Sequence, residues 1–326
     1  MDNVFRYRPS LTLLKSMDKS VKIQSDRFSD SASLDYMMDR YYIDIPLEFK
    51  GHEIWSAYMS EVRDQGNCGA CWAFSSVGTL SDRFSILTKG QLKIEMSVAK
   101  VILCDWGGDS KKAYPFFTQK LKSDIKDKYK YEVGCNGNSI QSALNYLYRY
   151  GTTSEECVPY DLGDFPDIST GDSDSIPVCQ TIVGKNQDQC ITGKPMRVFR
   201  ALSSYNIKND VRSIQYDIMR WGPVLSAFLI YEDFYKYNPT SDGVYRHGGD
   251  SKFVTGHAVE IVGWGGDNNG GWWWIKNTWG KDWGEDGYFR CEMMNPLLQL
   301  EENAMGCIPD IPTIPSISIM QYILPD

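Results

Sequence analysis

The sequence DQGNCGACWAF, residues 64–74, decides how the rest of the chain is interpreted. Gly66 and Gly69 allow a tight loop that delivers Cys71 to the start of the segment that follows. From residue 73 onward the apolar side chains recur at spacings of four, three, four and three residues, which predicts an amphipathic helix closed by Gly90. These apolar positions are Ala73, Val77, Leu80, Phe84 and Leu87. A thiol in the first turn of a helix meets the positive end of the helix dipole and free backbone N–H groups, and both favour the nucleophilic thiolate.

A nucleophilic cysteine needs an oxyanion donor and a base, and the sequence offers a candidate for each. Gln65 belongs to the same loop, so its side-chain amide and the Cys71 N–H would together make a two-donor oxyanion hole. His257 opens the apolar stretch HAVEIVGW and lies between the small residues Gly256 and Ala258, which makes it the best candidate for the general base.

Asn277, in WIKNTWG, would accept the imidazole N–H and so fix the orientation of the ring. Trp279 would shield that hydrogen bond from water, and Trp283 would add to the screen. A histidine at a strand end, or an asparagine before a turn, is more often structural when it occurs alone. Their joint occurrence with the cysteine loop favours a catalytic site.

Length and composition narrow the class of protein. A chain of 326 residues favours two structural units, and 42% hydrophobic with 23% charged residues is typical of a globular protein. The formal net charge of −8 disfavours nucleic acid as a partner. No run approaches the ~18 apolar residues that span a bilayer. Only three histidines are present and only one CxxC pair, Cys68 and Cys71, so we expect no metal and no cofactor; a redox dithiol remains an alternative at this point.

The order of the expected elements indicates an α+β protein of two lobes. Further helices are expected over about 139–150 and 209–221, each ended by glycine. After them the pattern changes to short strands parted by Gly, Asp and Asn. The expected strands cover 224–231, 243–246, 257–264, 272–278 and 287–293.

The two ends and two internal stretches stand outside this pattern. Residues 1–43 are polar and lack glycine, so they read either as a tail or as a short inhibitory pro-segment. Residues 106–132 are rich in lysine and residues 155–177 are acidic, and solvated faces are the simplest interpretation of both. The last stretch, 311–326, is rich in proline, which excludes a long helix.

Taken together, DQGNCGACWAF, GHAVEIVGWG and WIKNTWGKDWGEDGYF resemble the papain family of cysteine proteases. Four shorter motifs, SDRFSILTKG, GCNG, CVPY and GVYRHGG, resemble the cathepsin B group within it. The resemblance implies a peptidase domain over 44–310, with a helical lobe over about 60–195, a β-barrel-like lobe over about 196–305 and the active site in the cleft between them. Charged insertions would then occupy about 106–132 and 161–195.

The resemblance also assigns roles. It makes Cys71 the nucleophile, His257 the general acid and base, Asn277 the orienting residue and Gln65 the oxyanion donor, and this mechanism passes through a thiolate–imidazolium pair and an acyl-enzyme. Gly137 and Asn138 would contact an extended substrate through their backbone; the family has two glycines there, so Asn138 is a departure.

Disulfides follow from the same resemblance. It implies Cys68–Cys135 and Cys104–Cys157, after which Cys179–Cys190 and Cys291–Cys307 are the remaining pairs. Four bridges among nine cysteines leave Cys71 unpaired, which agrees with a catalytic thiol and counts against the redox dithiol.

The activity expected from the resemblance is that of a cysteine endopeptidase. Cathepsin B releases C-terminal dipeptides with the help of two histidines in an occluding loop. The corresponding stretch, about 161–195, has no histidine here and is acidic, so it would repel a substrate carboxylate. A carboxydipeptidase and a catalytically silent binding homologue are the alternatives.

The expected partners are protein or peptide substrates and possible protein inhibitors, with the chain itself a monomer. Paired cysteines favour an oxidising, lysosome-like or extracellular compartment. The N-terminal residues lack the apolar core of a signal peptide, so packaging into a virus particle is a further hypothesis.

Overall fold

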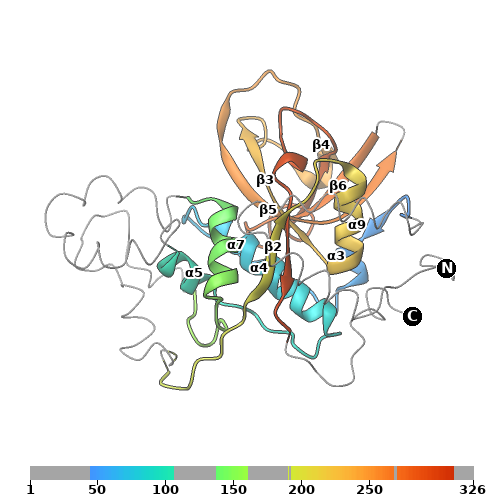
Figure 1. The fold of residues 1–326 in the computed structure, drawn as a ribbon. Coiled ribbons are helices and arrows are strands. Elements are labelled where there is room, and N and C mark those ends of the chain that lie inside the picture. Colours follow the sequence, from blue (N-terminus) through green and yellow to red (C-terminus); the bar gives the residue numbers. More distant parts are fainter. Residues whose placement is uncertain (1–44, 106–136, 161–189, 191, 268–269, 312–326) are drawn as a thin grey trace, which may run out of the picture.

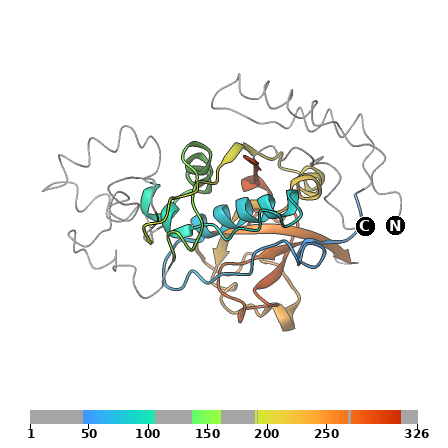
Figure 2. The same cartoon turned by 90° about the horizontal axis from the view of Figure 1, so that it is seen from below.

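A long central helix, α4 (Cys71–Leu87), organises the computed structural model, which describes residues 45–105, 137–160, 190, 192–267 and 270–311. The apolar periodicity predicted this helix, and Val77, Leu80 and Phe84 are indeed buried. It lies between helix α7 (Ile140–Arg149) and strand β5 (Phe253–Asp267) (Figure 2). The chain leaves the helix through Gly90, whose φ of 77° is the left-handed conformation that glycine adopts at no steric cost.

Three further helices surround α4 (Figure 1). Two of them, α7 and α9 (Val211–Trp221), were predicted, and both end where the sequence places glycine, at Gly151 and Gly222. The third, α5 (Val98–Cys104), was not predicted; the Ser97 side chain caps it by accepting a hydrogen bond from the Lys100 N–H. The described residues also form two single-turn helices, α3 (Gly51–Ile54) and α10 (Pro239–Asp242).

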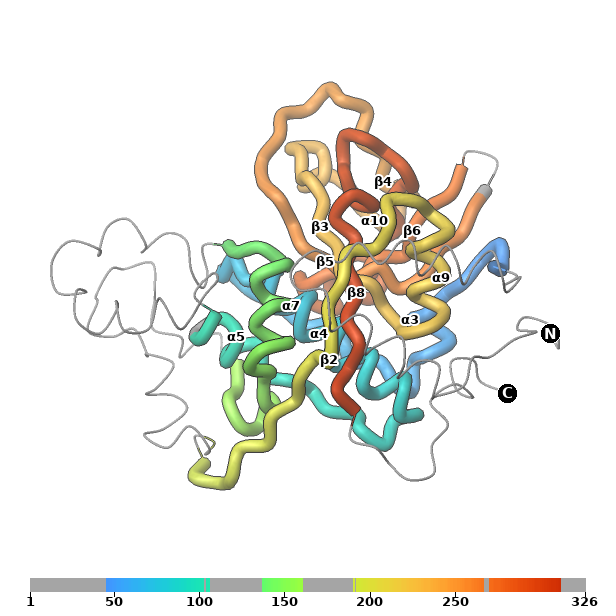
Figure 3. Tube along the Cα trace, in the orientation of Figure 1, coloured from blue at the N-terminus to red at the C-terminus, as the bar shows by residue number. Residues whose placement is uncertain are grey.

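One sheet of eight strands is formed by the described residues, in the order β2-β8-β3-β5-β6-β7-β4, with β1 paired to β5. Neighbouring strands are antiparallel except β4 and β7. The five predicted strands are present, whereas β1, β2 and β8 were missed; β2 and β8 run side by side between α7 and α9 (Figure 3). The strands are β1 (Phe49–Lys50), β2 (Ala201–Asn206), β3 (Val224–Tyr231), β4 (Val244–Tyr245), β5, β6 (Gly270–Lys276), β7 (Tyr288–Glu292) and β8 (Met305–Pro309).

The apolar core falls into two clusters. The first gathers α4, α5 and α7, with Leu80, Ile102 and Leu144 among its buried members. The second gathers most of the sheet and α9, including Trp264 and Ile218. Strand β5 contributes to both, through Ala258 in the first and Val259 in the second, because successive side chains of a strand point to opposite faces. Helices and sheet are therefore tied together along β5.

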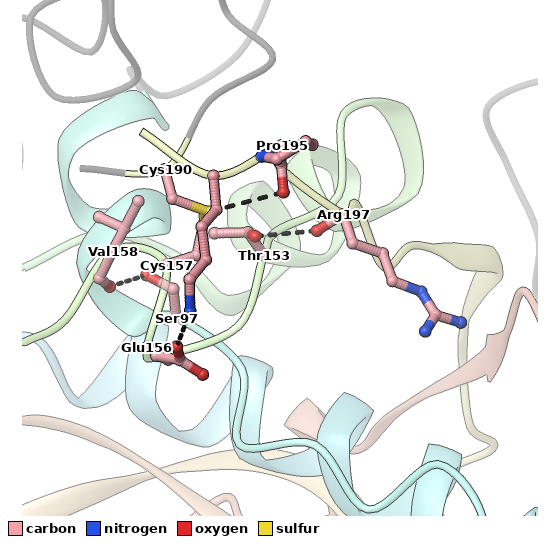
Figure 4. The surroundings of a disulfide bond; sticks show 9 residues. Ser97, Thr153, Glu156, Cys157, Val158, Cys190, Pro195 and Arg197 are labelled. Carbon is pink, nitrogen blue, oxygen red and sulfur yellow. Dashed lines mark hydrogen bonds and ion pairs between the residues drawn. A yellow bond between two sulfur atoms is a disulfide. The ribbon is translucent and has the colours of Figure 1, made fainter. Parts of the chain in front are cut away.

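The disulfide framework differs from the expected one. Cys157 is bonded to Cys190, so the expected pairs Cys104–Cys157 and Cys179–Cys190 are wrong (Figure 4). A local turn explains the pairing, because the Cys190 N–H donates to the Lys194 carbonyl, and Lys194 forms an ion pair with Glu156 at 3.1 Å. These contacts hold Cys190 beside Cys157, 33 residues earlier in the chain.

The expected Cys291–Cys307 bridge is also wrong, because both thiols are free and buried. They belong to different core clusters, Cys291 to the second and Cys307 to the first, which separates them in space. Cys68 and Cys104 are each disulfide-bonded. Cys135 and Cys179 lie outside the described residues, so Cys68–Cys135 stays a prediction. The tails 1–43 and 312–326, and nearly all of both charged insertions, lie outside them as well.

Candidate active site

The loop before α4 delivers Cys71 to the first position of the helix, as the glycines predicted. Gly66 has a φ of 56°, and its N–H donates to Asp64 Oδ1 at 2.7 Å. Ala70 is the last residue before the helix, and Cys71 carries a free thiol. Cys68, by contrast, is in a disulfide. A redox dithiol made of Cys68 and Cys71 is therefore excluded in this structure.

Gln65 lies in the same loop, buried and held at both ends of its side-chain amide. Its Nε2 donates to the Cys68 carbonyl at 2.8 Å, and its Oε1 accepts from the Thr278 hydroxyl. Because a primary amide nitrogen carries two hydrogens, one N–H of Gln65 remains for a further acceptor. This leaves the donor that an oxyanion hole requires.

His257 lies on β5 next to the point where that strand meets the start of α4. Cys71 packs against the core cluster that contains Ala258, the following residue, and the Ala258 N–H acts to lower the pKa of the Cys71 thiol. The His257 ring is buried, and its Nε2 lies 2.8 Å from Asn277 Oδ1. Since Nε2 is engaged by the amide oxygen, Nδ1 is the ring nitrogen left to exchange a proton.

Asn277 follows the last residue of β6 and is itself buried. Its Oδ1 also accepts from the Thr278 N–H at 2.9 Å, which fixes the amide that orients the imidazole. Trp279 packs on the His257 ring with centroids 5.0 Å apart. Trp283 in turn contacts Trp279, with 5.2 Å between ring centroids.

Burial acts on both members of the cysteine–histidine pair in the direction of the neutral form. It raises the pKa of the Cys71 thiol, against which the N–H groups of Ala258, Trp72 and Cys71 itself act in the opposite direction. It also lowers the pKa of His257 to about 4, while the hydrogen bond to Asn277 raises it. A charge on only one of the two groups is therefore disfavoured. A Cys71 thiolate and a His257 imidazolium must form together, because each is then stabilised by the charge of the other.

Gly137 and Asn138 precede α7. Gly137 has a φ of 96°, and a methyl group added there would meet none of the described residues within 4 Å. The Asn138 side chain is turned toward Asp105, with 3.3 Å between Nδ2 and Oδ2, and its Oδ1 accepts from the Ser139 N–H. The Asn138 side chain thus binds protein groups on its own side, and none of the described side chains fills the space beside Gly137.

Two contributors to the site escaped the sequence analysis. Thr278 binds both Gln65 and Asn277, and so couples the oxyanion candidate to the orienting amide. The Tyr160 hydroxyl donates to the Gln65 carbonyl at 2.8 Å from 95 residues away. Thr278 could have been suspected as the neighbour of Asn277, whereas nothing in the sequence around Tyr160 points to Gln65.

The described residues give no sign of other site chemistry. In that part of the chain, no three His, Cys, Asp or Glu side chains gather as a metal ion would require. None of the described helices combines the length and the apolar character that a membrane span needs. The groups that the structure brings together at this site are a thiol, an imidazole and two amides.

Comparison with known proteins agrees with this arrangement. Residues 46–307 match the model of the papain family cysteine proteases. The chain is 33% identical to the cathepsin B-like CP3 of Giardia intestinalis over 263 residues, which cover 80% of this chain and 74% of that protein. It is 31% identical to the cathepsin B-like cysteine proteinase 6 of Caenorhabditis elegans over 292 residues, covering 84% of this chain and 69% of that protein.

The fold is similar to that of a solved zymogen. The procathepsin B S9 structure from Trypanosoma congolense superimposes with a TM-score of 0.63 at 26% identity, covering 89% of this chain and 85% of that one.

Proposed function

This chain belongs to the papain family of cysteine proteases and is cathepsin B-like, and on that premise we propose that Cys71 and His257 are its catalytic pair. Asn277 orients the imidazole, and Gln65 with the Cys71 N–H binds the oxyanion. The observation that carries the proposal is that Cys71 packs against the core cluster that contains Ala258, the residue next to His257, and that the Ala258 N–H opposes the rise that burial causes in the pKa of the Cys71 thiol.

Hydrolysis proceeds in two halves. Cys71 gives its proton to His257, and the sulfur forms a bond to the scissile carbonyl carbon while the C=O π electrons move to oxygen. The Gln65 and Cys71 N–H groups stabilise that oxygen. When the carbonyl re-forms, the C–N bond breaks and His257 protonates the leaving nitrogen. Water then loses a proton to His257 and attacks the thioester, and breaking of the C–S bond releases the acid and restores the thiol.

Endopeptidase action is the mode we propose. Capture of a substrate C-terminus requires a cationic or imidazole donor, and the chain has only two histidines besides His257. His52 packs against Trp274 and Tyr288, and His247 binds Asp233 at 2.8 Å. Neither belongs to the stretch 161–189 that precedes Cys190, which is acidic and lacks histidine.

Two substrates separate the two modes of cleavage. A quenched fluorescent peptide with a C-terminal amide can be cut only internally, whereas a peptide with a free C-terminal carboxylate allows dipeptide release. We expect turnover of the first and no ordered loss of dipeptides from the second. Preferred removal of C-terminal dipeptides would show that the carboxydipeptidase alternative is correct.

Labelling with a thiol-alkylating epoxide separates an active enzyme from a silent homologue. We expect stoichiometric modification of Cys71 in the folded, reduced protein, and none of the buried thiols Cys291 and Cys307. Denatured protein, in which Cys71, Cys291 and Cys307 all become accessible, is the reference. A folded protein whose Cys71 resists the reagent would contradict the proposed function.

The remaining parts of the proposal concern organisation. We propose a helical lobe over about 60–195 and a β lobe over about 196–305, since the two core clusters separate in a similar way. Residues 1–43 are proposed to be a pro-segment, and the enzyme to act as a monomer on protein or peptide substrates. Size-exclusion chromatography and N-terminal sequencing after activation test these points.

A further inference from the structure

Three ionisable side chains meet in the interior of the protein. They are Asp82 from α4, Glu260 from β5 and Lys276 from β6, and all three are buried. The Lys276 Nζ lies 2.8 Å from Asp82 Oδ2 and 3.8 Å from Glu260 Oε1. We refer to these residues as the buried charge cluster.

Close packing completes the cluster. Lys276 also donates to the Ser60 hydroxyl at 2.9 Å, and the Ser60 N–H donates to Asp82 Oδ1 at 2.6 Å. A methyl group at Gly78 would lie 2.2 Å from Glu260 Oε1, so only glycine lets α4 approach this carboxyl group. The lysine is therefore held by three side chains in a site with little room for movement.

Each element that supplies the cluster also contains or directly precedes a residue of the candidate active site. Helix α4 begins at Cys71, and β5 carries His257 three residues before Glu260. Lys276 directly precedes Asn277, and Glu260 and Lys276 are partners in the β5–β6 ladder. One lysine thus joins the three elements whose relative placement sets the distances among Cys71, His257 and Asn277.

We propose that Lys276 is a positioning residue, which fixes β5 and β6 against α4 and thereby holds the His257–Asn277 pair at the distance from Cys71 that proton transfer requires. This inference rests on the proposed function, because it assigns a role relative to that catalytic pair. Lys276 acts through its neighbours and does not itself touch substrate.

Fold stability alone is a weak explanation for the cluster. The loss of hydration offsets much of the attraction within a buried ion pair, so well-packed apolar side chains often serve stability equally well. Burial raises the pKa of Glu260 to about 8, which shows how unfavourable a further charge is there. The ion pair also fixes where its partners lie, because the Lys276 ammonium group must stay between the carboxyl oxygens of Asp82 and Glu260.

The next residue of α4 supplies an internal comparison. Arg83 forms a buried ion pair with Asp217, and the Tyr205 hydroxyl donates to Asp217 Oδ2 at 2.6 Å. This second pair joins α4 to α9, which carries none of the proposed active-site residues. Ser60 and Tyr205 therefore each give one hydroxyl to a buried ion pair of α4, and only the first of those pairs is bonded to side chains of β5 and β6.

The matched variants Ser60→Ala and Tyr205→Phe test the proposal in the full-length protein after activation. Losing one hydroxyl contact is expected to lower kcat about twofold to fivefold in Ser60→Ala, with KM unchanged. Tyr205→Phe is expected to keep the wild-type kcat, although its melting temperature falls by about as much as that of Ser60→Ala. Lys276→Met is the stronger variant, with kcat lowered roughly 10- to 100-fold because small displacements of reacting groups are costly.

Alkylation of Cys71 by iodoacetamide at several pH values supplies a readout that a merely structural role would not move. We expect the pH profile of alkylation to change in Ser60→Ala and Lys276→Met and to stay as in wild type in Tyr205→Phe. Equal effects of Ser60→Ala and Tyr205→Phe, or a folded Lys276→Met with wild-type kcat, would overturn the inference while leaving the proposed function intact. A wild-type protein that hydrolyses no peptide would overturn both.

Discussion

Helix α4 and strand β5 bury ionisable side chains at two places, and the two places differ in their polar partners. At the first, Cys71 and His257 meet dipoles, namely the Ala258 N–H and the Asn277 amide oxygen. At the second, Asp82 meets the full charge of Lys276. Burial favours the neutral forms of Cys71 and His257, whereas at Lys276 the neighbouring Asp82 and Glu260 outweigh the effect of burial and raise the pKa of the ammonium group. Proton transfer is therefore possible between Cys71 and His257, whereas the ion pair of Asp82 and Lys276 keeps its charges and ties α4 to β6.

Among variants of the Cys71–His257 site, Cys71→Ala is expected to have the largest effect, because it removes the nucleophile. We expect kcat/KM to fall by roughly 10⁴-fold or more, because the two-step mechanism loses its covalent intermediate. Peptide hydrolysis under reducing conditions measures it, with Cys307→Ala as the matched control. Cys307 is a buried thiol outside the proposed site, so a comparable loss in that control would mean that the assay reports folding.

Gln65→Ala is the next largest change and tests whether dipoles alone stabilise the transition state. We expect kcat to fall by roughly 10²- to 10³-fold with little change in KM, as when one oxyanion donor is removed. Gln141→Ala is the control, since Gln141 lies on α7 and its amide binds only Asn145 among the contacts of its side chain that the structure describes. A Gln65→Ala enzyme that loses affinity in place of turnover would assign Gln65 to ground-state binding.

Glu260→Gln tests the buried charge cluster through the pH dependence of the free energy of unfolding. Burial raises the pKa of Glu260 from 4.5 to about 8, so the folded protein keeps a proton that the unfolded chain has lost. The free energy of unfolding therefore falls as pH rises from about 4.5 to about 8, by ~1.4 kcal/mol for each unit of pKa difference. Glutamine cannot ionise, so the variant is expected to lose this dependence.

Thermal unfolding at pH 5 and pH 8 measures the change, with the exposed Glu302→Gln as control. The charged and titratable groups that face Glu260 are Lys276, Asp82, Arg83, Tyr288 and Cys307. A Glu260→Gln protein whose melting temperature falls between these pH values as much as that of wild type would show that another group dominates.

The smallest effect is expected from Trp279→Leu, which opens the His257–Asn277 hydrogen bond to water. We expect a fall in kcat of about fivefold, the equivalent of ~1 kcal/mol for a hydrogen bond that gains competition from solvent. Trp283→Leu should have a weaker effect because Trp283 contacts Trp279 and not the imidazole in the described contacts. The ratio of the two kcat values is the measurement, and a larger effect at Trp283 would contradict the shielding role.

Local sequence patterns predicted the elements whose structure depends on near neighbours. The stripe from Ala73 to Leu87 gave α4 because its period matches the helix, and VLSAFLIY gave β3 with the same bounds. Strand β2 was missed since only one of its residues is buried, which leaves no alternation to detect. Strand β8 was missed because it is short and ends at a proline.

Features that depend on residues far apart in the chain could not be predicted in this way. The Cys157–Cys190 bond follows from a turn at 190–194, and the expected Cys291–Cys307 bond fails because the two thiols lie in separate clusters. Glu260 occurs in HAVEIVGW, where one polar residue among apolar ones is typical of a solvent-facing position. Its burial depends on Lys276 and Gly78, which no local pattern connects to it.

The disulfide between Cys157 and Cys190 would hold the chain together after a cut between these two residues. Every peptide bond from 158 to 189 lies inside the ring that this bond closes. A cut anywhere in that interval, whether by the enzyme itself or by another protease, leaves two fragments covalently joined. On a denaturing gel such material migrates as one band until a reductant is added, and then as two.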